Sequence, residues 1–350
     1  MKAKKVLIGM SGGVDSSVAA YQMVQSGYSC IGATMTLWGT EATDDAESVA
    51  RRLGIPFRTF DFREEFQRQV IEKFVSCYES GLTPNPCIVC NRCLKFGSLL
   101  REAEKLGCEA VVTGHYARLR RSQETGRYLL CKAADSVKDQ TYFLACLSQE
   151  QLAHIQFPLG ELTKPQVRAI AQEQGFVTAR KHDSQDICFV PEGDYAAFLE
   201  RWTGKTYPCG DYVNLEGQVL GKHQGAVRYT IGQRKGLGIS LGAPAYVCGK
   251  DMQKNTVTLG PNEALFSRGL RANDWHFFPF PALPGPMRVT VKTRHSQREA
   301  DGTVYPEENG FARVEFDTQQ RAVTPGQAVV LYQGELVIGG GTITEAIRSL

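Results

Sequence analysis

A short segment rich in glycine and serine offers the clearest chemistry in the sequence. Ser11-Gly12-Gly13-Val14-Asp15-Ser16-Ser17 lies between an apolar run at 5–10 and an amphipathic run at 14–25. The glycines let the backbone turn sharply, the serines add hydroxyl donors, and the first N–H groups of the expected helix point to the same place. The lysine of a Walker loop and the spacing G-x-G-x-x-G are both missing. The segment predicts a cradle for the pyrophosphate part of a nucleotide.

Two cysteines lie in settings that favour thiol chemistry. Cys90 follows a loop with two prolines and lies beside Arg92 and Lys95, ahead of a helix predicted over about 95–106. Cationic neighbours and a helix N-terminus both lower the pKa of a thiol, so we expect Cys90 to be a nucleophilic thiolate. Cys188 lies among polar residues far along the chain. These two thiols are the predicted reactive groups.

Strands and helices alternate in the first half of the chain, as the spacing of apolar residues indicates. Strands separated by helices form parallel sheets with helices on both faces, and ligands bind at the carboxyl ends of the strands. The segment 11–17 is expected at such an end. Strands are predicted over 5–10, 30–37, 57–60 and 110–113, and helices over 14–25, 44–53 and 64–78.

The second half is predicted to consist of short strands. From about Tyr207 onward, glycine and proline separate the alternating runs, which predicts one or two small β domains. The proline-rich segment 277–286 is expected near a domain boundary. Strands are predicted over 245–248, 256–259, 288–292, 312–316 and 328–331.

Composition narrows the class of protein. The 350 residues include Lys+Arg 40 and Asp+Glu 37, a net charge of +3 that is too small to indicate nucleic-acid binding by itself. A hydrophobic share of 42% excludes a disordered chain, and the length predicts two or three domains. No apolar run reaches the ~18 residues of a membrane span, and the run near the N-terminus is too short for a secretory signal. Eleven cysteines, an odd number, favour the reducing cytoplasm.

The segment 11–17 resembles the PP-loop signature of the ATP pyrophosphatases, which split ATP into AMP and pyrophosphate. With the stretches around both cysteines, the sequence resembles the tRNA-specific 2-thiouridylases, which replace the C2 oxygen of the wobble uridine with sulfur. The resemblance implies a PP-loop parallel-sheet domain at 1–200, a small central β-rich domain at 201–265 and a tRNA-contacting C-terminal β-barrel at 266–350. Further matching stretches are Gly114-His115-Tyr116-Ala117-Arg118, Lys138-Asp139-Gln140-Thr141-Tyr142-Phe143-Leu144, Gly232-Gln233-Arg234-Lys235-Gly236-Leu237-Gly238-Ile239 and Ala322-Val323-Thr324-Pro325-Gly326-Gln327.

The resemblance also implies the reaction partners and the roles of single residues. Cys90 matches the family's nucleophile and Cys188 the cysteine that carries the incoming sulfur as a persulfide, and the two are implied to close a disulfide during turnover. ATP would bind with Mg²⁺, which Asp15 would help to hold. The partners would be a tRNA with a wobble uridine and a protein that donates persulfide sulfur, with no membrane.

Matching positions extend these implied roles along the chain. From the residues alone, a structural hydrogen bond is an alternative for His115, a solvated turn for Arg294-His295 and a surface ion pair for Lys138-Asp139. ATP contacts are implied for Gly9, Met10, Ser11, Gly12, Gly13, Val14, Asp15, Ser16, Met35 and Gly114, contacts with the flipped-out base for Asn85, Pro86 and Cys87, and tRNA contacts for His115, Lys138, Asp139, Gln140, Arg294, His295 and Gln327.

Position 87 departs from the pattern of the family. Many members carry aspartate there, proposed as an acid/base group, and Cys87 leaves the general base unassigned. The change also creates the spacing Cys87-x2-Cys90-x2-Cys93, which with Cys188 gives up to four thiolates. An iron–sulfur cluster or zinc is therefore an alternative to persulfide chemistry. Against it, thiols three residues apart at a helix start cannot all reach one metal unless a loop intervenes.

Two other functions compete with tRNA thiolation. A PP-loop ligase that acts on a small molecule would share the segment 11–17 but would not need Cys90 or Cys188. A metal- or redox-sensing RNA-binding protein would use Cys87, Cys90 and Cys93, and would bind tRNA without ATP turnover.

Overall fold

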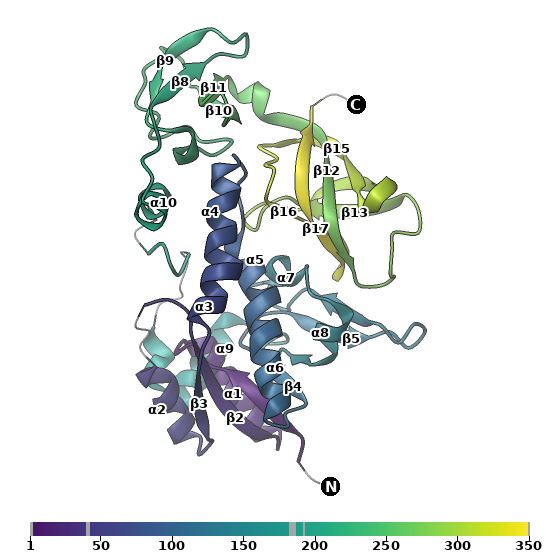
Figure 1. Ribbon diagram of the computed structural model, residues 1–350. Coiled ribbons are helices and arrows are strands. Elements are labelled where there is room, and N and C mark those ends of the chain that lie inside the picture. The colour runs from purple at the N-terminus through teal and green to yellow at the C-terminus, as the bar shows by residue number, and fades with distance from the viewer. Residues whose placement is uncertain (1–2, 40–42, 182–186, 192, 349–350) are drawn as a thin grey trace.

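Three parts follow one another along the chain (Figure 1). The computed structural model describes residues 3–39, 43–181, 187–191 and 193–348. An α/β layer comes first, a small β domain follows, and a β-barrel comes last. This architecture confirms the predicted fold class. Among the described residues, no helix is both long and apolar enough to cross a membrane.

A five-stranded parallel sheet forms the centre of the α/β layer. Strands β2 and β3 lie on one side of β1, and β4 and β7 lie on the other, so the chain changes direction between β1 and β4. Open α/β sheets bind ligands outside the carboxyl ends of the strands at such a switch point. The bounds are β1 Lys5–Gly9, β2 Ser29–Thr36, β3 Phe57–Asp61, β4 Ala110–Val112 and β7 Ile155–Gln156, which confirms the four strands predicted in this half.

Helices cover both faces of the sheet because the strand side chains alternate. In β1, Val6 and Ile8 pack into one core and Leu7 into the other. The first core lies under three helices, whose bounds are α1 Val14–Gln25, α2 Asp44–Arg52 and α9 Lys164–Glu173. Residues 63–79 and 86–105 form two long helical stretches that pack into the second core. The helices predicted at 14–25, 44–53 and 64–78 are confirmed.

The two long helical stretches reach from the sheet toward the other parts (Figure 1). The first comprises α3 Arg63–Phe66, a π-helical turn at Gln67–Ile71 and α4 Glu72–Glu79. The second comprises α5 Pro86–Cys90, a π-helical stretch at Asn91–Ser98 and α6 Leu99–Lys105. This stretch begins at Pro86, because the fixed φ of proline suits the first turn of a helix. The predicted start near residue 95 was therefore wrong. Gln151 Nε2 stabilises the π-helical stretch by donating to Arg92 O at 2.7 Å and to Phe96 O at 2.8 Å.

Short helices and hairpins connect these elements. Their bounds are β5 Arg118–Arg121, β6 Tyr128–Cys131, α7 Thr141–Leu144, α8 Gln149–Ala153 and α10 Tyr195–Thr203. After α10, a four-stranded sheet in the order β10-β11-β8-β9 forms the small central domain. Its core is small and contains Tyr212, Val247 and Val257. The strands are β8 Gly210–Val213, β9 Val219–His223, β10 Tyr246–Asp251 and β11 Thr256–Gly260.

Six strands close the C-terminal barrel, because β12 pairs with both β15 and β17. Pairing of Leu336 with Cys131 attaches the β5–β6 hairpin to the same sheet, so main-chain hydrogen bonds join the barrel to the first part. The proline-rich segment 277–286 connects β12 to β13 within the barrel, so its predicted place at a boundary was wrong. The strands are β12 Phe266–Phe277, β13 Met287–Lys292, β14 Ala300–Pro306, β15 Ala312–Arg321, β16 Ala328–Gln333 and β17 Leu336–Ile347.

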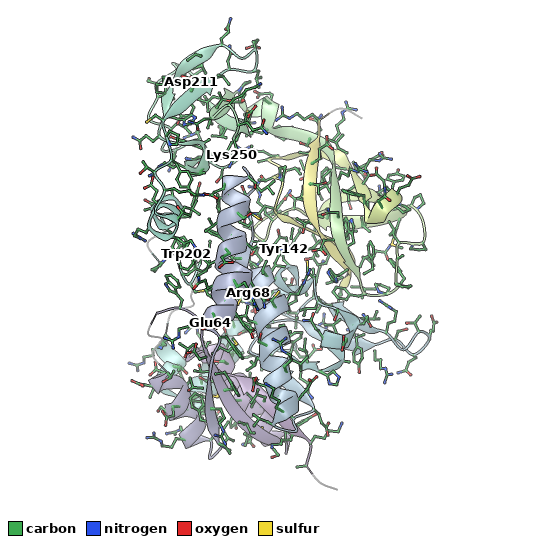
Figure 2. All side chains as sticks on the ribbon, in the orientation of Figure 1. Glu64, Arg68, Tyr142, Trp202, Asp211 and Lys250 are labelled. Atoms are coloured by element: carbon green, nitrogen blue, oxygen red, sulfur yellow. The ribbon has the colours of Figure 1, made fainter. Side chains whose placement is uncertain are left out.

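Replacing the buried Lys250 in β10 should change the stability of the fold measurably. It lies near the end of α4 (Figure 2), and within the described part of the chain its buried Nζ has no hydrogen-bond partner. Burial lowers the pKa of Lys250 to about 8. We expect Lys250→Met to raise the free energy of unfolding at about pH 7 by about 1–3 kcal/mol, because methionine fills similar space without a charge to desolvate.

The lowered pKa of Lys250 also predicts how the stability changes with pH. Between about pH 8 and the ordinary lysine pKa of 10.5, the unfolded chain keeps a proton at Lys250 that the folded chain has lost, so this residue makes wild type more stable as pH rises. The advantage of Lys250→Met should therefore shrink when urea unfolding is repeated at about pH 10. Lys254→Met is the control, because the Lys254 side chain is 79% exposed. An unchanged or lowered stability of Lys250→Met at neutral pH contradicts the prediction.

Candidate nucleotide and thiol site

The loop between β1 and α1 folds tightly around the start of the helix. Gly12 has a φ of +68°, which favours glycine, and Gly13 is the N-cap of α1. Ser16 Oγ accepts from Ser11 N at 3.2 Å and donates to Gly13 O at 3.1 Å. Ser17 Oγ donates to Gly13 O at 2.9 Å. Since the first N–H groups of a helix have no partner within it, the loop presents donors for an anion.

Residues at the ends of the neighbouring strands lie beside this loop. Gly114 follows β4, and a Cβ there would lie 2.7 Å from the Asp15 carbonyl carbon and from Ser16 N, so a larger residue would displace the loop. Met35 lies near the carboxyl end of β2 and is half-buried. The structure therefore places the predicted ATP contacts at the carboxyl ends of β1, β2 and β4, on both sides of the switch point.

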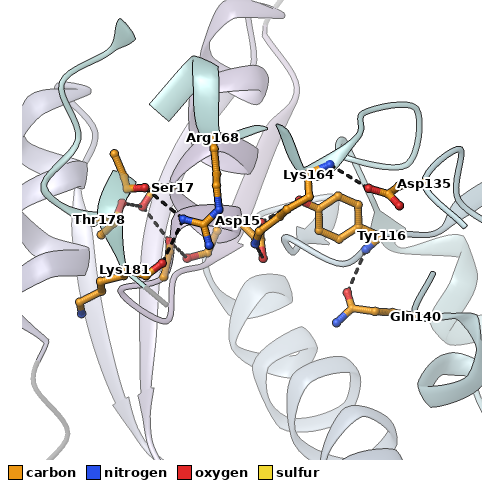
Figure 3. Close-up of polar contacts among 12 residues, drawn as sticks. Asp15, Ser17, Tyr116, Asp135, Gln140, Lys164, Arg168, Thr178 and Lys181 are labelled. Carbon is orange, nitrogen blue, oxygen red and sulfur yellow. Dashed lines mark hydrogen bonds and ion pairs between the residues drawn. The ribbon is translucent and has the colours of Figure 1, made fainter. Parts of the chain in front are cut away.

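Two residues that the sequence analysis missed hold the carboxylate of the loop. Lys164 Nζ lies 2.7 Å from Asp15 Oδ1 and 2.8 Å from Oδ2, and Tyr116 OH donates to Oδ1 at 2.8 Å (Figure 3). Lys164 is only 7% exposed and Tyr116 only 2%. The only available signal was Thr163 followed by Pro165, which marks a helix start but not its distant partner.

The segment that follows α9 is fastened to the same loop. Thr178 Oγ1 and Ser17 Oγ lie 3.0 Å apart, and Lys181 Nζ donates to Gly12 O at 3.1 Å. Arg168 Nη1 donates to the carbonyl oxygens of residues 179 and 181, at 3.2 and 3.1 Å (Figure 3). These contacts fix the chain directly before residues 182–186.

Cys188 is exposed, and the residue after it is anchored in the core. The Phe189 ring packs edge to face with the rings of Phe74 and Phe66, with centroid distances of 5.1 and 5.6 Å. Phe189 thereby ties the cysteine to the first long helical stretch. The polar residues 183–186, which the sequence places before Cys188, lie outside the described residues.

Cys90 is the last residue of α5, and it lies close enough to Cys188 for the two thiols to interact electrostatically. Burial raises the pKa of Cys90 to about 12, Lys95 opposes that rise, and the thiols of Cys188, Cys87 and Cys93 add to it. The predicted low pKa was wrong, because the helix starts at Pro86, about one turn before Cys90, and desolvation outweighs the lysine. All eleven cysteines are free thiols in this structure, so the implied disulfide stays a prediction.

A turn of the barrel holds the predicted base-binding loop. Thr83 N donates to Pro325 O at 3.0 Å, and Gln327 Nε2 donates to Thr83 O at 3.1 Å. Gly326 has a φ of +90°, and a Cβ there would lie 2.9 Å from Thr83 N. Residues 85–87 follow at the start of α5, so these contacts tie the chain just before α5 to the barrel. The predicted contact of Gln327 with tRNA stays a prediction.

Two of the residues predicted to contact tRNA are buried. His115 is 8% exposed, its Nδ1 lies 2.8 Å from Thr113 Oγ1, and burial lowers the pKa of His115 well below its ordinary value. The structural alternative for His115 is therefore favoured. Asp139 Oδ1 accepts from Ala133 N at 2.9 Å and Oδ2 accepts from Thr141 Oγ1 at 2.6 Å.

The remaining predicted tRNA contacts lie closer to the surface. Gln140 Oε1 accepts from Tyr116 N at 3.0 Å, which links residues 138–140 to the nucleotide loop. Arg294 Nη2 donates to a carbonyl oxygen at the end of β15 at 3.2 Å. The His295 ring lies 4.5 Å from a phenylalanine ring of α7, and Lys138 is half-buried. Contacts of these residues with tRNA stay predictions.

Three family models together match most of the chain. Residues 4–192 match a tRNA methyl transferase HUP domain, residues 196–261 a tRNA methyl transferase PRC-barrel domain, and residues 267–343 an aminomethyltransferase beta-barrel domain. The first of these models alone matches more than half of the 350 residues.

Curated relatives match over almost the whole length. A tRNA-specific 2-thiouridylase MnmA from Acetivibrio thermocellus is 49% identical, with 98% of this chain and 100% of that protein covered. The proteins of the same name from Symbiobacterium thermophilum and Clostridioides difficile are 48% and 45% identical. They cover 99% and 98% of this chain, and 93% and 99% of their own lengths.

Proposed function

The chain belongs to the family of tRNA-specific 2-thiouridylases and is a tRNA sulfurtransferase, and on this premise we propose that it replaces the C2 oxygen of the wobble uridine with sulfur while consuming ATP. One observation carries the proposal: the glycine- and serine-rich loop after β1 and the segments that bear Cys90 and Cys188 belong to one packed unit. Leu99, in the helical stretch that carries Cys90, would lie 3.5 Å from a Cβ at Gly9 of the loop. The division at 1–200, 201–265 and 266–350 is part of this proposal.

The loop serves the first chemical step. The C2 carbonyl of uridine is a poor electrophile, and its oxygen is a poor leaving group. We assign to the loop the transfer of AMP from ATP to this oxygen: the oxygen bonds to the α-phosphorus, the bond to the β-phosphate bridge breaks, and pyrophosphate leaves. The N–H donors at the start of α1 would stabilise the negative charge of the phosphates. The base must leave the anticodon stack to reach them, and residues 85–87 would form a wall beside it.

The thiols serve the second step. The terminal sulfur of a Cys188 persulfide attacks C2, and AMP departs with the former C2 oxygen. Cys90 Sγ, after losing its proton, then attacks Cys188 Sγ and breaks the sulfur–sulfur bond. This leaves a thiocarbonyl on the base and a Cys90–Cys188 disulfide, so the sulfane sulfur is reduced as two thiols are oxidised. A thiol reductant must open the disulfide, and a persulfide donor protein must recharge Cys188.

Mg²⁺ is expected to enter with the phosphates of ATP. The Asp15 carboxylate is 31% exposed and offers the oxygen ligands that Mg²⁺ prefers, although Lys164 and Tyr116 hold it here. An iron–sulfur cluster would need several ligands close together. Among the described residues, no three His, Cys, Asp or Glu side chains are placed to hold one metal ion. Cys87, Cys90 and Cys93 lie along one continuous helical stretch.

The competing functions explain less of the structure. A small-molecule ligase has no use for neighbouring Cys90 and Cys188 thiols, and an RNA-binding sensor has no use for the phosphate loop. The matched domain models carry a methyl-transfer name, but sulfur transfer accounts for both thiols. We also propose that the protein acts in the reducing cytoplasm, because the reaction cycle needs free thiols.

Reconstitution tests the proposed function. Purified protein is incubated with ATP, Mg²⁺, a persulfide donor and unmodified tRNA, under aerobic conditions and under anaerobic conditions with iron. We expect 2-thiouridine in the digested tRNA, with one AMP and one pyrophosphate for each thiolated base, under both conditions. Thiolation only with iron and without oxygen contradicts the persulfide route. ATP cleavage without thiouridine contradicts tRNA as the acceptor.

A further inference from the structure

Lys164 occupies an unfavourable place for a lysine. It is the first residue of α9, where the positive end of the helix dipole repels a cation. Its side chain is only 9% exposed, and lysine is rarely buried to that degree unless it is paired. Asp135 fixes its backbone by accepting from Lys164 N at 2.9 Å. The pairing with Asp15 offsets the burial, so a cation kept here against the helix dipole indicates a function at the site it faces.

The partners of Lys164 connect it to the phosphate loop. Lys164 Nζ donates to both carboxylate oxygens of Asp15, the second residue of α1, and Tyr116 OH also donates to Oδ1. The Tyr116 ring lies 5.9 Å from Nζ, so the ammonium group lies between an anion and an aromatic face (Figure 3). These contacts fix the position of the charge beside the N-terminus of α1.

The charges of the site explain why a lysine is needed. A carboxylate at the start of α1 would repel the phosphates of ATP, and Lys164 neutralises it. The pyrophosphate that leaves in the adenylation step is strongly anionic, and a cation beside the loop amides would add to their stabilisation of it. Lysine is a compact point charge that suits phosphate oxygens. Lys181 is a second lysine at the loop, but its Nζ donates to Gly12 O and forms an ion pair with Asp45.

We propose that Lys164 is a phosphate-binding residue of the ATP site, held in position by Asp15 and Tyr116. The assignment rests on the proposed function, because it requires that the loop binds ATP. The lysine gives up no proton in this role. It stabilises the β- and γ-phosphates in bound ATP and the pyrophosphate as the bond to the α-phosphorus breaks.

Binding of ATP, pyrophosphate and AMP to the full-length protein, measured by calorimetry without tRNA, tests the assignment. Lys164→Met should weaken ATP and pyrophosphate binding by roughly 10- to 100-fold, the range expected for a lost charged hydrogen bond, and AMP binding by less than about threefold. Lys164→Arg should keep most of the affinity. Lys132→Met is the matched control, because Lys132 also pairs with a carboxylate, Glu299 at 2.6 Å, away from the loop.

The double variant Asp15→Asn/Lys164→Met separates phosphate binding from neutralisation of Asp15, and it also removes the risk that an unpaired, partly buried carboxylate destabilises the protein. The assignment predicts that the double variant still binds ATP and pyrophosphate weakly. Recovery of wild-type affinity, or an equal loss for ATP and AMP in Lys164→Met, overturns it while the proposed function stands. Wild-type protein that binds no ATP overturns both.

Discussion

Replacing Cys188 with serine should lower the rate of tRNA thiolation by about 10³-fold or more while ATP binding stays unchanged, because a hydroxyl cannot carry a persulfide. Replacing Cys90 should be as damaging, but at a later point. In Cys90→Ser the persulfide can still attack C2, and no thiol remains to break the sulfur–sulfur bond. The base then stays covalently attached to Cys188. Without an added reductant, neither variant should release 2-thiouridine.

The covalent adduct distinguishes the two roles. Denaturing gels should show a tRNA–protein adduct with Cys90→Ser, which dithiothreitol releases as thiouridylated tRNA, and no adduct with Cys188→Ser. Cys209→Ser is the matched control, since Cys209 is also exposed but lies in the segment before β8. Full activity of either Cys90→Ser or Cys188→Ser contradicts the assigned roles. An adduct with Cys188→Ser shows that the roles are reversed.

Alkylation of Cys90 by iodoacetamide should become about tenfold faster for each pH unit between about 7 and 10, without a plateau. Only the thiolate reacts, and because burial raises the pKa of Cys90 to about 12, its thiolate fraction keeps rising across this range. An ordinary thiol levels off above about pH 8.5. The measurement is the rate of Cys90 modification by peptide mass spectrometry at each pH.

Lys95 provides an internal check on this prediction. Its charge lowers the pKa of Cys90, so Lys95→Met should slow alkylation at a given pH. Lys105→Met is the control, because Lys105 lies in the same helical stretch but is paired with Glu102. A plateau below about pH 9 in wild type contradicts the buried thiol. In the proposed cycle, a resting Cys90 that stays neutral would not attack the Cys188 persulfide before C2 is activated.

The conformation of the loop at residues 11–17 was predictable because its determinants are local. Gly12, Gly13 and the serines close hydrogen bonds with one another, and the strand and helix on either side follow from apolar spacing. Asp15 shows the limit of such reasoning. Its partners Lys164 and Tyr116 lie 149 and 101 residues away in the chain, and no local pattern specifies that the sheet brings them together.

The thiol site shows a different limit. Sequence neighbours such as Lys95 suggest a low pKa for Cys90, but burial is set by the whole fold and has the larger effect. His115 likewise follows a strand, and only the packed structure shows that it is buried and bonded to Thr113. Residue type and spacing therefore suggest which residues to test for reactivity, whereas their protonation and exposure depend on tertiary packing.

The fate of the C2 oxygen tests the central claim most directly. Unmodified tRNA with oxygen-18 at C2 of the wobble uridine is thiolated in a single turnover, and the released AMP is analysed by mass spectrometry. If the oxygen is adenylated before sulfur attacks, each AMP should carry one oxygen-18 in its phosphate for each 2-thiouridine formed. Oxygen-18 in water or in pyrophosphate, with unlabelled AMP, would contradict adenylation of the base.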